Sequence, residues 1–358
     1  MLKILHIAPQ NYAGVPYGFY QMHNACGDHS RLITLHKNQF DLPEDVNLNL
    51  PLPNFNLAKL WRRKKLETRE LERKTSAPYF EFKNAFEKYY FVINDFFRKS
   101  KVDDIIDKLQ LNDFDIIHYD AGLDFFRNSS QALKWKHQGK KIVCCYYGSD
   151  LRTRGVIKEL DEISDLNITS EFDHLALKKD LKYIFYPYDT SELPQREINN
   201  SGKIRIVHSP TNRKFKGTEL IISVIDKLKK QKNIDFILLE KLPRHEVLNI
   251  KKSCDICIDQ VGGTMGGTGY GKAGIETLGM GIPTITNMTD DYNEWLPENP
   301  FVVANNEVQL YQRLIELIED QNLRDELGAK GKLWVNKYHG FESVNNRLYE
   351  LYRENGII

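Results

Sequence analysis

The sequence of 358 residues lacks any long apolar run and any strong excess of charge of one sign. No run approaches the roughly 20 apolar residues that a membrane-spanning helix requires. Lys and Arg number 50 and Asp and Glu number 49, so the formal net charge is only +1. Such a balance gives no global field that would attract nucleic acid. We therefore expect no membrane span and no nucleic-acid partner.

The start of the chain also lacks the apolar core of a signal peptide. Residues 1–8 are apolar over too short a stretch and instead predict a first buried strand. We therefore expect a cytoplasmic protein. The basic cluster between Trp61 and Lys65 leaves two interpretations open. It is either a solvated helix face or an amphipathic surface that brings the protein peripherally to the inner face of the membrane.

Cysteine is scarce, with five residues in the chain. Cys254 and Cys257 have the spacing of half a zinc site, but no second pair completes it. Cys144 and Cys145 lie inside an apolar run that is typical of a buried strand. We predict that all five, Cys26 included, are reduced core cysteines. We expect neither a metal site nor a bound cofactor.

The length exceeds that of one typical core and favours two domains. Strands alternate with helices in both halves, which predicts an α/β fold of two Rossmann-like domains that face each other across a cleft. The first domain is predicted at 1–190, with a helical insertion at about 57–109, and the second at 204–340. A polar linker separates them. Residues 341–358 are predicted as a C-terminal helix, with packing back on the first domain as one interpretation.

In the first domain, runs of consecutive apolar residues predict parallel strands that are buried on both faces. The predicted strands are 2–8, 31–36, 115–120, 141–147, 165–169 and 183–188. Gly14 follows the first of these strands, and Asp150 follows the fourth. Open α/β sheets bind ligands at the carboxyl ends of their strands. Asp150 is therefore either a carboxylate on the ligand side or a helix N-cap.

The second domain repeats the pattern of strand, loop and helix. The predicted strands are 204–208, 235–240, 255–261, 283–286 and 301–303, and helices are predicted from Thr218 and at 244–252, 307–319, 322–337 and 342–354. The loop 209–217 carries Arg213, Lys214 and Lys216. Cations at this position suit a diphosphate, although a solvated basic turn remains an alternative.

A glycine-rich run from Gly262 to Gly271, with six glycines in ten residues, precedes a short helix predicted at 272–280. Gly281 suits the left-handed position past the end of this helix, and Pro283 prevents its continuation. A glycine loop that leads into a helix N-terminus binds anions, because amide N–H groups and the positive end of the helix dipole point at the ligand. The alternative is a flexible surface loop before a core helix.

The residues at the end of this loop and in the helix are candidates for holding a nucleotide. The glycine cradle of a diphosphate is predicted at 266–271, with Thr268, Gly269, Tyr270 and Gly271 as binding residues. Glu276, about one turn into the helix, could accept a hydrogen bond from a hydroxyl beside the anion. A sugar nucleotide presents this combination of a diphosphate and a ribose diol.

With these motifs the sequence resembles the GT-B glycosyltransferases of the large retaining family 4 over nearly its whole length. The matching stretches are 208–217, 255–260, 274–285, 115–118, 147–152 and 187–189. The resemblance implies that Lys216 and Arg213 neutralise the diphosphate of the donor, that Glu276 binds the ribose hydroxyls, and that Gly14 lets its loop approach the donor. The family has a pair of glutamates eight positions apart, and Thr268 takes the place of the first.

The function implied is a glycosyltransferase that moves a sugar from a nucleotide diphosphate-sugar to a hydroxyl of a glycan or lipid-linked acceptor, in the synthesis of surface polysaccharide or glycoconjugate. Retention of configuration and independence of metal are expected from the resemblance. Asp150 or Asp120 would orient the acceptor hydroxyl. Two alternatives stay open: a non-catalytic partner with the same fold, and a nucleotide-sugar epimerase.

Overall fold

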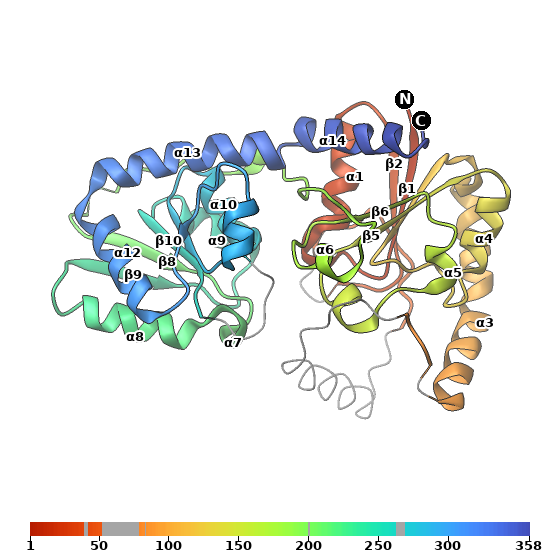
Figure 1. Ribbon diagram of the computed structural model, residues 1–358, viewed down its shortest axis with the longest axis horizontal. Helices are drawn as coiled ribbons and strands as arrows, with labels where there is room; N and C mark the ends of the chain where they lie inside the picture. The colour runs from red at the N-terminus through yellow and green to blue at the C-terminus, as the bar shows by residue number, and fades with distance from the viewer. Residues whose placement is uncertain (39–41, 52–78, 83, 200, 263–268) are drawn as a thin grey trace. The chain divides into compact units, whose positions relative to one another are not determined.

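The computed structural model describes residues 1–38, 42–51, 79–82, 84–199, 201–262 and 269–358. The chain divides into two compact units (Figure 1). Unit 1 contains Met1–Tyr188 and Phe341–Ile358, and unit 2 contains Asp189–Gly340. The polar segment predicted as a linker therefore belongs to unit 2. The basic cluster from Trp61 to Lys65 lies outside the described residues.

Unit 1 is built on a seven-stranded parallel sheet in the order β3-β2-β1-β4-β5-β6-β7. The strands are β1 (Lys3–Ala8), β2 (His29–Thr34), β3 (Val46–Asn47), β4 (Ile116–Asp120), β5 (Lys141–Tyr146), β6 (Leu166–Thr169) and β7 (Lys182–Tyr183). No strand was predicted at β3. Of the strand predicted at 183–188, only the first residue belongs to β7, which pairs with β6. Edge strands of two residues are too short to produce a recognisable apolar pattern.

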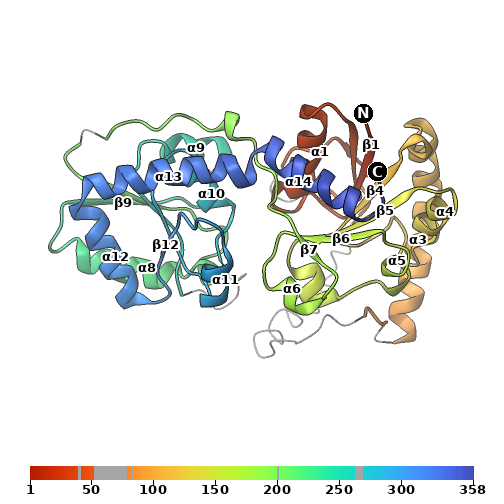
Figure 2. The ribbon, with the colours of Figure 1, turned by 45° about the horizontal axis from the view of Figure 1, so that its top comes forward.

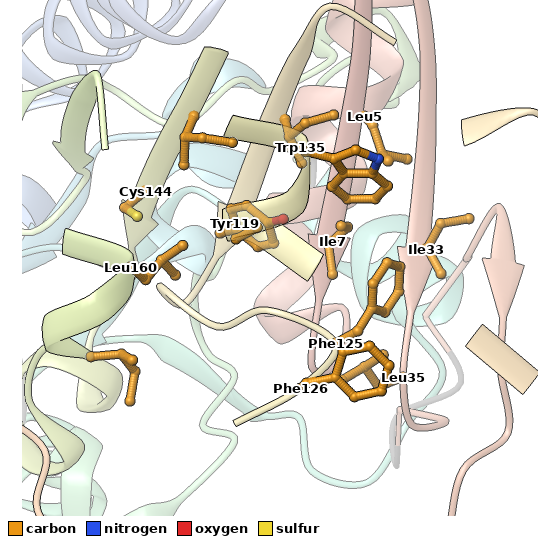
Figure 3. Packing of buried hydrophobic residues seen from close by; sticks show 14 of the residues in the cluster. Leu5, Ile7, Ile33, Leu35, Tyr119, Phe125, Phe126, Trp135, Cys144 and Leu160 are labelled. Atoms are coloured by element: carbon orange, nitrogen blue, oxygen red, sulfur yellow. The ribbon is translucent and has the colours of Figure 1, made fainter. Parts of the chain in front are cut away.

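The helices of unit 1 cover both faces of its sheet. Within the described part of this unit they are α1 (Val15–Ala25), α3 (Ala85–Lys108), α4 (Ser130–His137), α5 (Lys158–Asp161), α6 (His174–Leu177) and α14 (Phe341–Glu354). Neighbouring strand residues point to opposite faces. Leu5 and Ile7 therefore join a core with Tyr119, Phe125 and Trp135, as Figure 3 shows.

The other face of the same sheet packs against α1 and α14. Ile4 on β1 belongs to this second core, together with Phe19 of α1 and Leu348 of α14. Figure 2 shows α14 beside α1, at the end of the chain. The C-terminal helix thus packs on unit 1, where it contributes to a buried face of the sheet.

Helix α1 begins at Val15, directly after Gly14, and not at Gly18. Gly14 adopts a left-handed conformation with φ of 76°, and Pro16 lies in the first turn, where a missing N–H costs nothing. Gly18 is instead inside the helix. A Cβ atom at Gly18 would lie 2.9 Å from the carbonyl oxygen of Pro187, so glycine allows α1 to approach that segment.

Unit 2 contains a five-stranded parallel sheet in the order β12-β11-β10-β8-β9. The strands are β8 (Ile204–His208), β9 (Ile234–Leu238), β10 (Ile256–Gln260), β11 (Thr284–Thr286) and β12 (Val302–Val303). The helices are α7 (Arg213–Lys216), α8 (Thr218–Leu228), α9 (Arg244–Lys251), α10 (Lys272–Gly279), α11 (Asp290–Trp295), α12 (Glu307–Glu319) and α13 (Gln321–His339). One face packs against α8 and α12 and the other against α9 and α10.

The end of α10 follows the prediction. Gly281 has φ of 81°, in the left-handed region, and Pro283 precedes β11.

The cysteines agree with the prediction of buried, reduced side chains, with one exception. Cys144, Cys145, Cys254 and Cys257 are buried and unoxidised, whereas Cys26 is exposed at the end of α1. Among the described residues, no helix is long and apolar enough to cross a membrane.

Candidate active site

The candidate site of unit 2 lies where its strand order reverses. Strand β8 pairs with β9 on one side and with β10 on the other, so the chain leaves β8 in one direction and later returns to the opposite side. Loops after such a pair of strands diverge and leave space for a ligand at the carboxyl ends. The residues after β8 carry Lys216, and those after β10 lead to Gly271 and α10.

Lys216 is held by residues at the end of β10. Its Nζ atom donates to Asp259 Oδ1 at 2.7 Å and to Gln260 Oε1 at 2.9 Å. The lysine side chain is 15% exposed and that of Asp259 is fully buried, so the cation is the only one of the two that reaches solvent. An ammonium group has three N–H donors, and these two acceptors use two of them. The third is directed to neither acceptor and is left for an anion.

Gly271 closes the same arrangement from the other side. Its amide donates to Asp259 Oδ2 at 2.7 Å, so one carboxylate joins the lysine to the residue before α10. A Cβ atom at Gly271 would lie 2.9 Å from Lys216 Nζ. Its φ of −113° is available to any residue, so this glycine is needed for space and not for its backbone conformation.

The charge state of Asp259 follows from these contacts. Burial raises the pKa of the Asp259 carboxyl, but Lys216 and the Gly271 amide lower that pKa by more than burial raises it. The pKa therefore lies below its usual range. Asp259 is therefore ionised together with Lys216. Sequence reasoning did not select Asp259, because an acidic residue at the end of a strand gives no sign of which cation it will meet.

Glu276 lies one turn into α10, as predicted, but its carboxylate is buried and paired. Lys251 Nζ donates to Oε2 at 2.9 Å, and Arg244 Nε lies 3.3 Å from Oε1. Burial raises the pKa of Glu276, and the neighbouring cations, Lys251 first, bring it below its usual range. The side chain of Lys251 is 1% exposed and that of Arg244 is 38% exposed. The oxygen of Glu276 that lies nearer to solvent is therefore Oε1, beside Arg244. No pattern in the sequence indicates this pairing.

Arg213 does not share the environment of Lys216. Its guanidinium donates to Glu219 and to Glu240, at 2.8 Å in each case. The two side chains lie at opposite ends of the single turn of α7 and contact different acidic partners. Two carboxylates thus compensate the charge of Arg213, and its role at a diphosphate stays a prediction.

The remaining cradle residues have structural contacts. A Cβ atom at Gly269 would lie 2.4 Å from the ring of Tyr292, so a larger residue does not fit there. Tyr270 stacks on Phe301 with ring centroids 4.6 Å apart, and its hydroxyl lies 3.2 Å from His339 Nε2. These contacts fix the backbone just before Gly271. Thr268 lies outside the described residues.

Thr218 is the first residue of α8 and not its N-cap. Gly217 is the N-cap, and the Thr218 hydroxyl lies 2.9 Å from His208 Nε2. His208 Nδ1 donates to the Ile258 carbonyl at 2.7 Å, so Nε2 accepts from the threonine. Burial lowers the pKa of His208 to about 4, and the ring is neutral at pH 7. This histidine fastens β8 to β10 under the candidate site.

In unit 1, Gly14 lies in the loop after β1, as predicted, and Asp150 follows β5. The carboxylate of Asp150 accepts hydrogen bonds from the backbone of its own turn. Its Oδ1 accepts from the amides of Gly148 and Leu151, each at 2.8 Å, and its Oδ2 accepts from the Tyr147 amide at 2.9 Å. It braces the turn after β5 and is not the N-cap of the following helix, where Ser149 has that position.

Other polar residues at this end of the unit 1 sheet are also paired. Asp120 is 1% exposed and accepts hydrogen bonds from the Tyr147 hydroxyl and from His6. Arg152 forms ion pairs with Glu171 and Asp173. No group of acidic, histidine and cysteine side chains suitable for a metal ion occurs among the residues that the structure describes.

The comparisons with known proteins identify the fold. Protein-family models and curated proteins give no match to the sequence. Solved structures do match, at low identity. HepE from Anabaena in complex with UDP-glucose is 10% identical, with a TM-score of 0.54 over 98% of this chain and 100% of its own. The catalytic domain of starch synthase IV from Arabidopsis thaliana, bound to ADP and acarbose, is 12% identical, with a TM-score of 0.59 over 99% of both chains. TarM is 10% identical, with a TM-score of 0.58 over 98% of this chain and 99% of its own.

These neighbours have the GT-B fold, in which two Rossmann-like domains each carry a parallel sheet. The two sheets of this chain, with seven and five strands, agree with that architecture. The match extends over almost the whole length of both chains, so it includes both units. The predicted α/β class and GT-B fold are confirmed.

Proposed function

We propose that the chain is a glycosyltransferase that uses a nucleotide diphosphate-sugar as donor. The observation that carries the proposal is the arrangement of Lys216, Asp259 and Gly271 in unit 2. A cation with one N–H still available lies against a glycine at the N-terminus of an eight-residue helix. Amides and the positive helix end attract a phosphate at such a position.

Glu276 supports the assignment of the donor as a nucleotide. The diphosphate would contact Lys216 and the first amides of α10, and the ribose would lie further along that helix. There its hydroxyls would donate to Oε1 of Glu276, on the partly exposed side where Arg244 lies. Lys251 would hold the other oxygen in place.

In the proposed reaction, the bond between the anomeric carbon and the diphosphate oxygen breaks, and a bond to the acceptor oxygen forms. Lys216 and the α10 amides stabilise the negative charge that develops on the leaving diphosphate. The acceptor hydroxyl gives its proton to a departing phosphate oxygen, so no protein carboxylate is needed as a base. Asp150, whose two oxygens serve three backbone amides, has no part in this step.

We also propose the finer features that the resemblance implies: retention of configuration, no requirement for a metal ion, and a glycan or lipid-linked acceptor. The retaining geometry suits a site in which the leaving phosphate itself takes the proton of the acceptor. The place of the reaction would be the synthesis of a surface polysaccharide or glycoconjugate.

The test is a thermal-shift screen with UDP, GDP, ADP, CMP and their sugars. A ligand that binds only the folded state raises the melting temperature. We expect one diphosphate series to raise it and Lys216→Met to abolish that effect. Lys232→Met is the matched control, because Lys232 also pairs with a carboxylate, Glu319, in the same unit.

Turnover is then measured as release of the nucleoside diphosphate from the donor identified in the screen. We expect release by the wild type and none by Lys216→Met. Binding without release or transfer to any acceptor would instead identify a non-catalytic protein with this fold. No melting shift with any nucleotide would remove the basis of the proposal.

A further inference from the structure

Two arginines of unit 1, Arg127 and Arg154, lack the carboxylate partner that comparable arginines have. Three other partly buried arginines of this unit form ion pairs: Arg31 with Asp45 at 2.6 Å, Arg98 with Asp95 at 3.6 Å and Arg152 with Asp173 at 2.6 Å. Arg127 and Arg154 are also partly buried, but neither forms an ion pair with any residue that the structure describes. A buried cation without a partner is unfavourable, and an anion would relieve that cost.

Arg154 is held in place by backbone carbonyls. Its Nε donates to the Gly155 carbonyl at 3.1 Å, and its Nη2 donates to the Ala121 carbonyl. These contacts leave Nη1, with its two N–H groups, without a hydrogen bond to the described residues. Burial lowers the pKa of Arg154, and Asp150 raises it in part, but the oxygens of Asp150 already serve three amides of its own turn. The fold thus orients this guanidinium and leaves one of its nitrogens for a ligand.

Arg127 is held by aromatic rings. Its guanidinium carbon lies 4.9 Å from the ring centroid of Phe80 and 4.3 Å from that of Phe91. Its backbone amide donates to Asp95 at 2.8 Å, whereas no described residue accepts a hydrogen bond from its guanidinium, and Nη1 is buried without a partner. Rings attract the charge of a guanidinium through its faces, but they do not satisfy the N–H groups in its plane. These N–H groups are donors that still require an acceptor.

The two guanidinium groups also act on each other. Burial lowers the pKa of Arg127 to about 10, and the charge of Arg154 contributes to that decrease. Among the smaller influences, Asp95 and Glu87 raise this pKa and Arg98 lowers it. Both arginines therefore stay charged at neutral pH, although each is unfavourable for the other. Charged groups perturbed in this way concentrate at functional sites.

Both arginines lie at the edge of the sheet where open α/β sheets bind ligands. Arg127 follows β4 and Arg154 follows β5, and these strands pair in parallel, side by side in Figure 2. Ala121, directly after β4, has φ of 61°, in the left-handed region that is uncommon for residues other than glycine. The turn Asp150–Arg154 is π-helical. Both kinds of irregular backbone are frequent at functional sites.

A cavity of about 550 Å³ gives a ligand access to Arg127. Asn128 and Ser130 line it beside Arg127 and offer further N–H and O–H donors. The other charged residues of the lining are two lysines and two acids, namely Lys88, Lys99, Asp95 and Glu159. Their charges cancel, so Arg127 gives the cavity a net positive charge.

We propose that Arg127 and Arg154 together bind a phosphate monoester group, and that this phosphate is part of the acceptor, an assignment that rests on the proposed glycosyl transfer. A phosphate monoester carries about two negative charges at neutral pH, which match the two guanidinium groups, whereas a carboxylate carries one. The planar fork of an arginine also fits two phosphate oxygens at once. The diphosphate of the donor has its own cation, Lys216 of unit 2. The acceptor is therefore a hydroxyl compound that also carries a phosphate.

The experiment is titration calorimetry of the full chain with inorganic phosphate, methyl phosphate and acetate, at constant ionic strength and without nucleotide. We expect methyl phosphate to bind about as tightly as inorganic phosphate and at least tenfold more tightly than acetate. Arg127→Gln and Arg154→Gln should each raise the Kd for methyl phosphate at least tenfold. Arg347→Gln is the control, because Arg347 also belongs to unit 1 but pairs with Glu350 at 2.9 Å, and it should bind as the wild type does.

Phosphate can also bind at the donor site, so each titration is repeated with Lys216→Met. We expect this variant to bind methyl phosphate normally. Conversely, Arg127→Gln and Arg154→Gln should keep the melting shift with the nucleoside diphosphate that identifies the donor. Normal binding of methyl phosphate without a melting shift from any nucleotide would overturn the proposed transfer and with it the acceptor role, but not the phosphate site.

Four results would overturn the phosphate site itself: no binding of methyl phosphate by the wild type, equal binding by the two arginine variants, loss of binding in Lys216→Met, or equal affinity for acetate. Binding of inorganic phosphate without binding of methyl phosphate would assign the site to the free anion and would overturn the acceptor role. Unchanged circular dichroism of each variant establishes that the fold is retained.

Discussion

Lys251 Nζ lies 2.9 Å from Glu276 Oε2 in a part of unit 2 where neither side chain is more than 8% exposed. Burial lowers the pKa of Lys251, but the Glu276 carboxylate raises it by more, so the lysine is charged. The pair joins α9 to α10. The helix that begins at the candidate diphosphate site is thus fixed by an internal ion pair, which also determines how Glu276 is oriented.

Removing both partners of this pair should cost less than the sum of the two single removals. Lys251→Met and Glu276→Gln each leave a buried group without its partner, and we expect each to lower the free energy of unfolding by about 3 kcal/mol. The double variant should be more stable than the sum predicts, by about 2 kcal/mol. Urea denaturation of the four proteins measures this coupling. Additive losses would show that the two side chains do not interact in solution.

Asp259→Asn tests the carboxylate that joins Lys216 to Gly271. An amide presents an NH₂ group to one of the two donors, so one hydrogen bond is lost and a buried donor is left unpaired. We expect the free energy of unfolding to fall by about 2 kcal/mol. Asp235→Asn is the control, since Asp235 is half exposed, lies 3.7 Å from Arg205 and should contribute less than about 1 kcal/mol. Equal effects of the two changes would contradict a special role for Asp259.

Gly271→Ala should impair ligand binding more than folding. The backbone conformation accepts alanine, but the new Cβ displaces Lys216 Nζ from its position. We expect the Kd for the nucleoside diphosphate to rise at least tenfold, which is about 1.4 kcal/mol. Gly202→Ala is the control because its φ of 72° makes alanine costly while the space around it is open. Titration calorimetry should find normal affinity in Gly202→Ala, and normal affinity in both would refute the placement.

Repeating apolar strands and glycine-bearing loops were sufficient to predict the α/β class, the parallel sheets and the residues that follow β8 and β10. The position of Gly281 and the cations of the 209–217 loop were also recognisable, because they depend on local backbone rules and on composition. The pairing of side chains could not be predicted in this way. Asp259, Lys251 and Arg244 meet Lys216 and Glu276 only after distant segments fold together.

Two of the candidate residues meet partners that the sequence does not indicate. Asp150 and Arg213 were selected for residue type and for their place after a strand, and both criteria were met. Asp150 nevertheless accepts three backbone amides, and Arg213 meets Glu219 and Glu240. A sequence reveals where a charged group lies along the chain, whereas its availability depends on which partners the tertiary structure brings to it.

Acid should destabilise the protein through its buried histidines. Burial lowers the pKa of His208 to about 4, from a value near 6.5 in an unfolded chain. Between these values the unfolded chain binds a proton that the folded chain does not, so the free energy of unfolding falls as the pH falls. His208 alone should account for a loss of about 2 kcal/mol between pH 7 and pH 5. Burial also lowers the pKa of His23 and of His118 in unit 1, which adds losses of the same sign.

Urea denaturation at several pH values measures this loss, and His208→Gln separates the contribution of one ring. Glutamine retains an N–H donor for the Ile258 carbonyl but does not titrate in this range. The variant should be less stable than the wild type at pH 7, and the difference between them should shrink by about 2 kcal/mol at pH 5. A constant difference across this range would mean that His208 takes up its proton in the folded state at an ordinary pKa. The hydrogen bonds of a neutral His208 ring to Ile258 and Thr218 would then not be what holds β8 against β10.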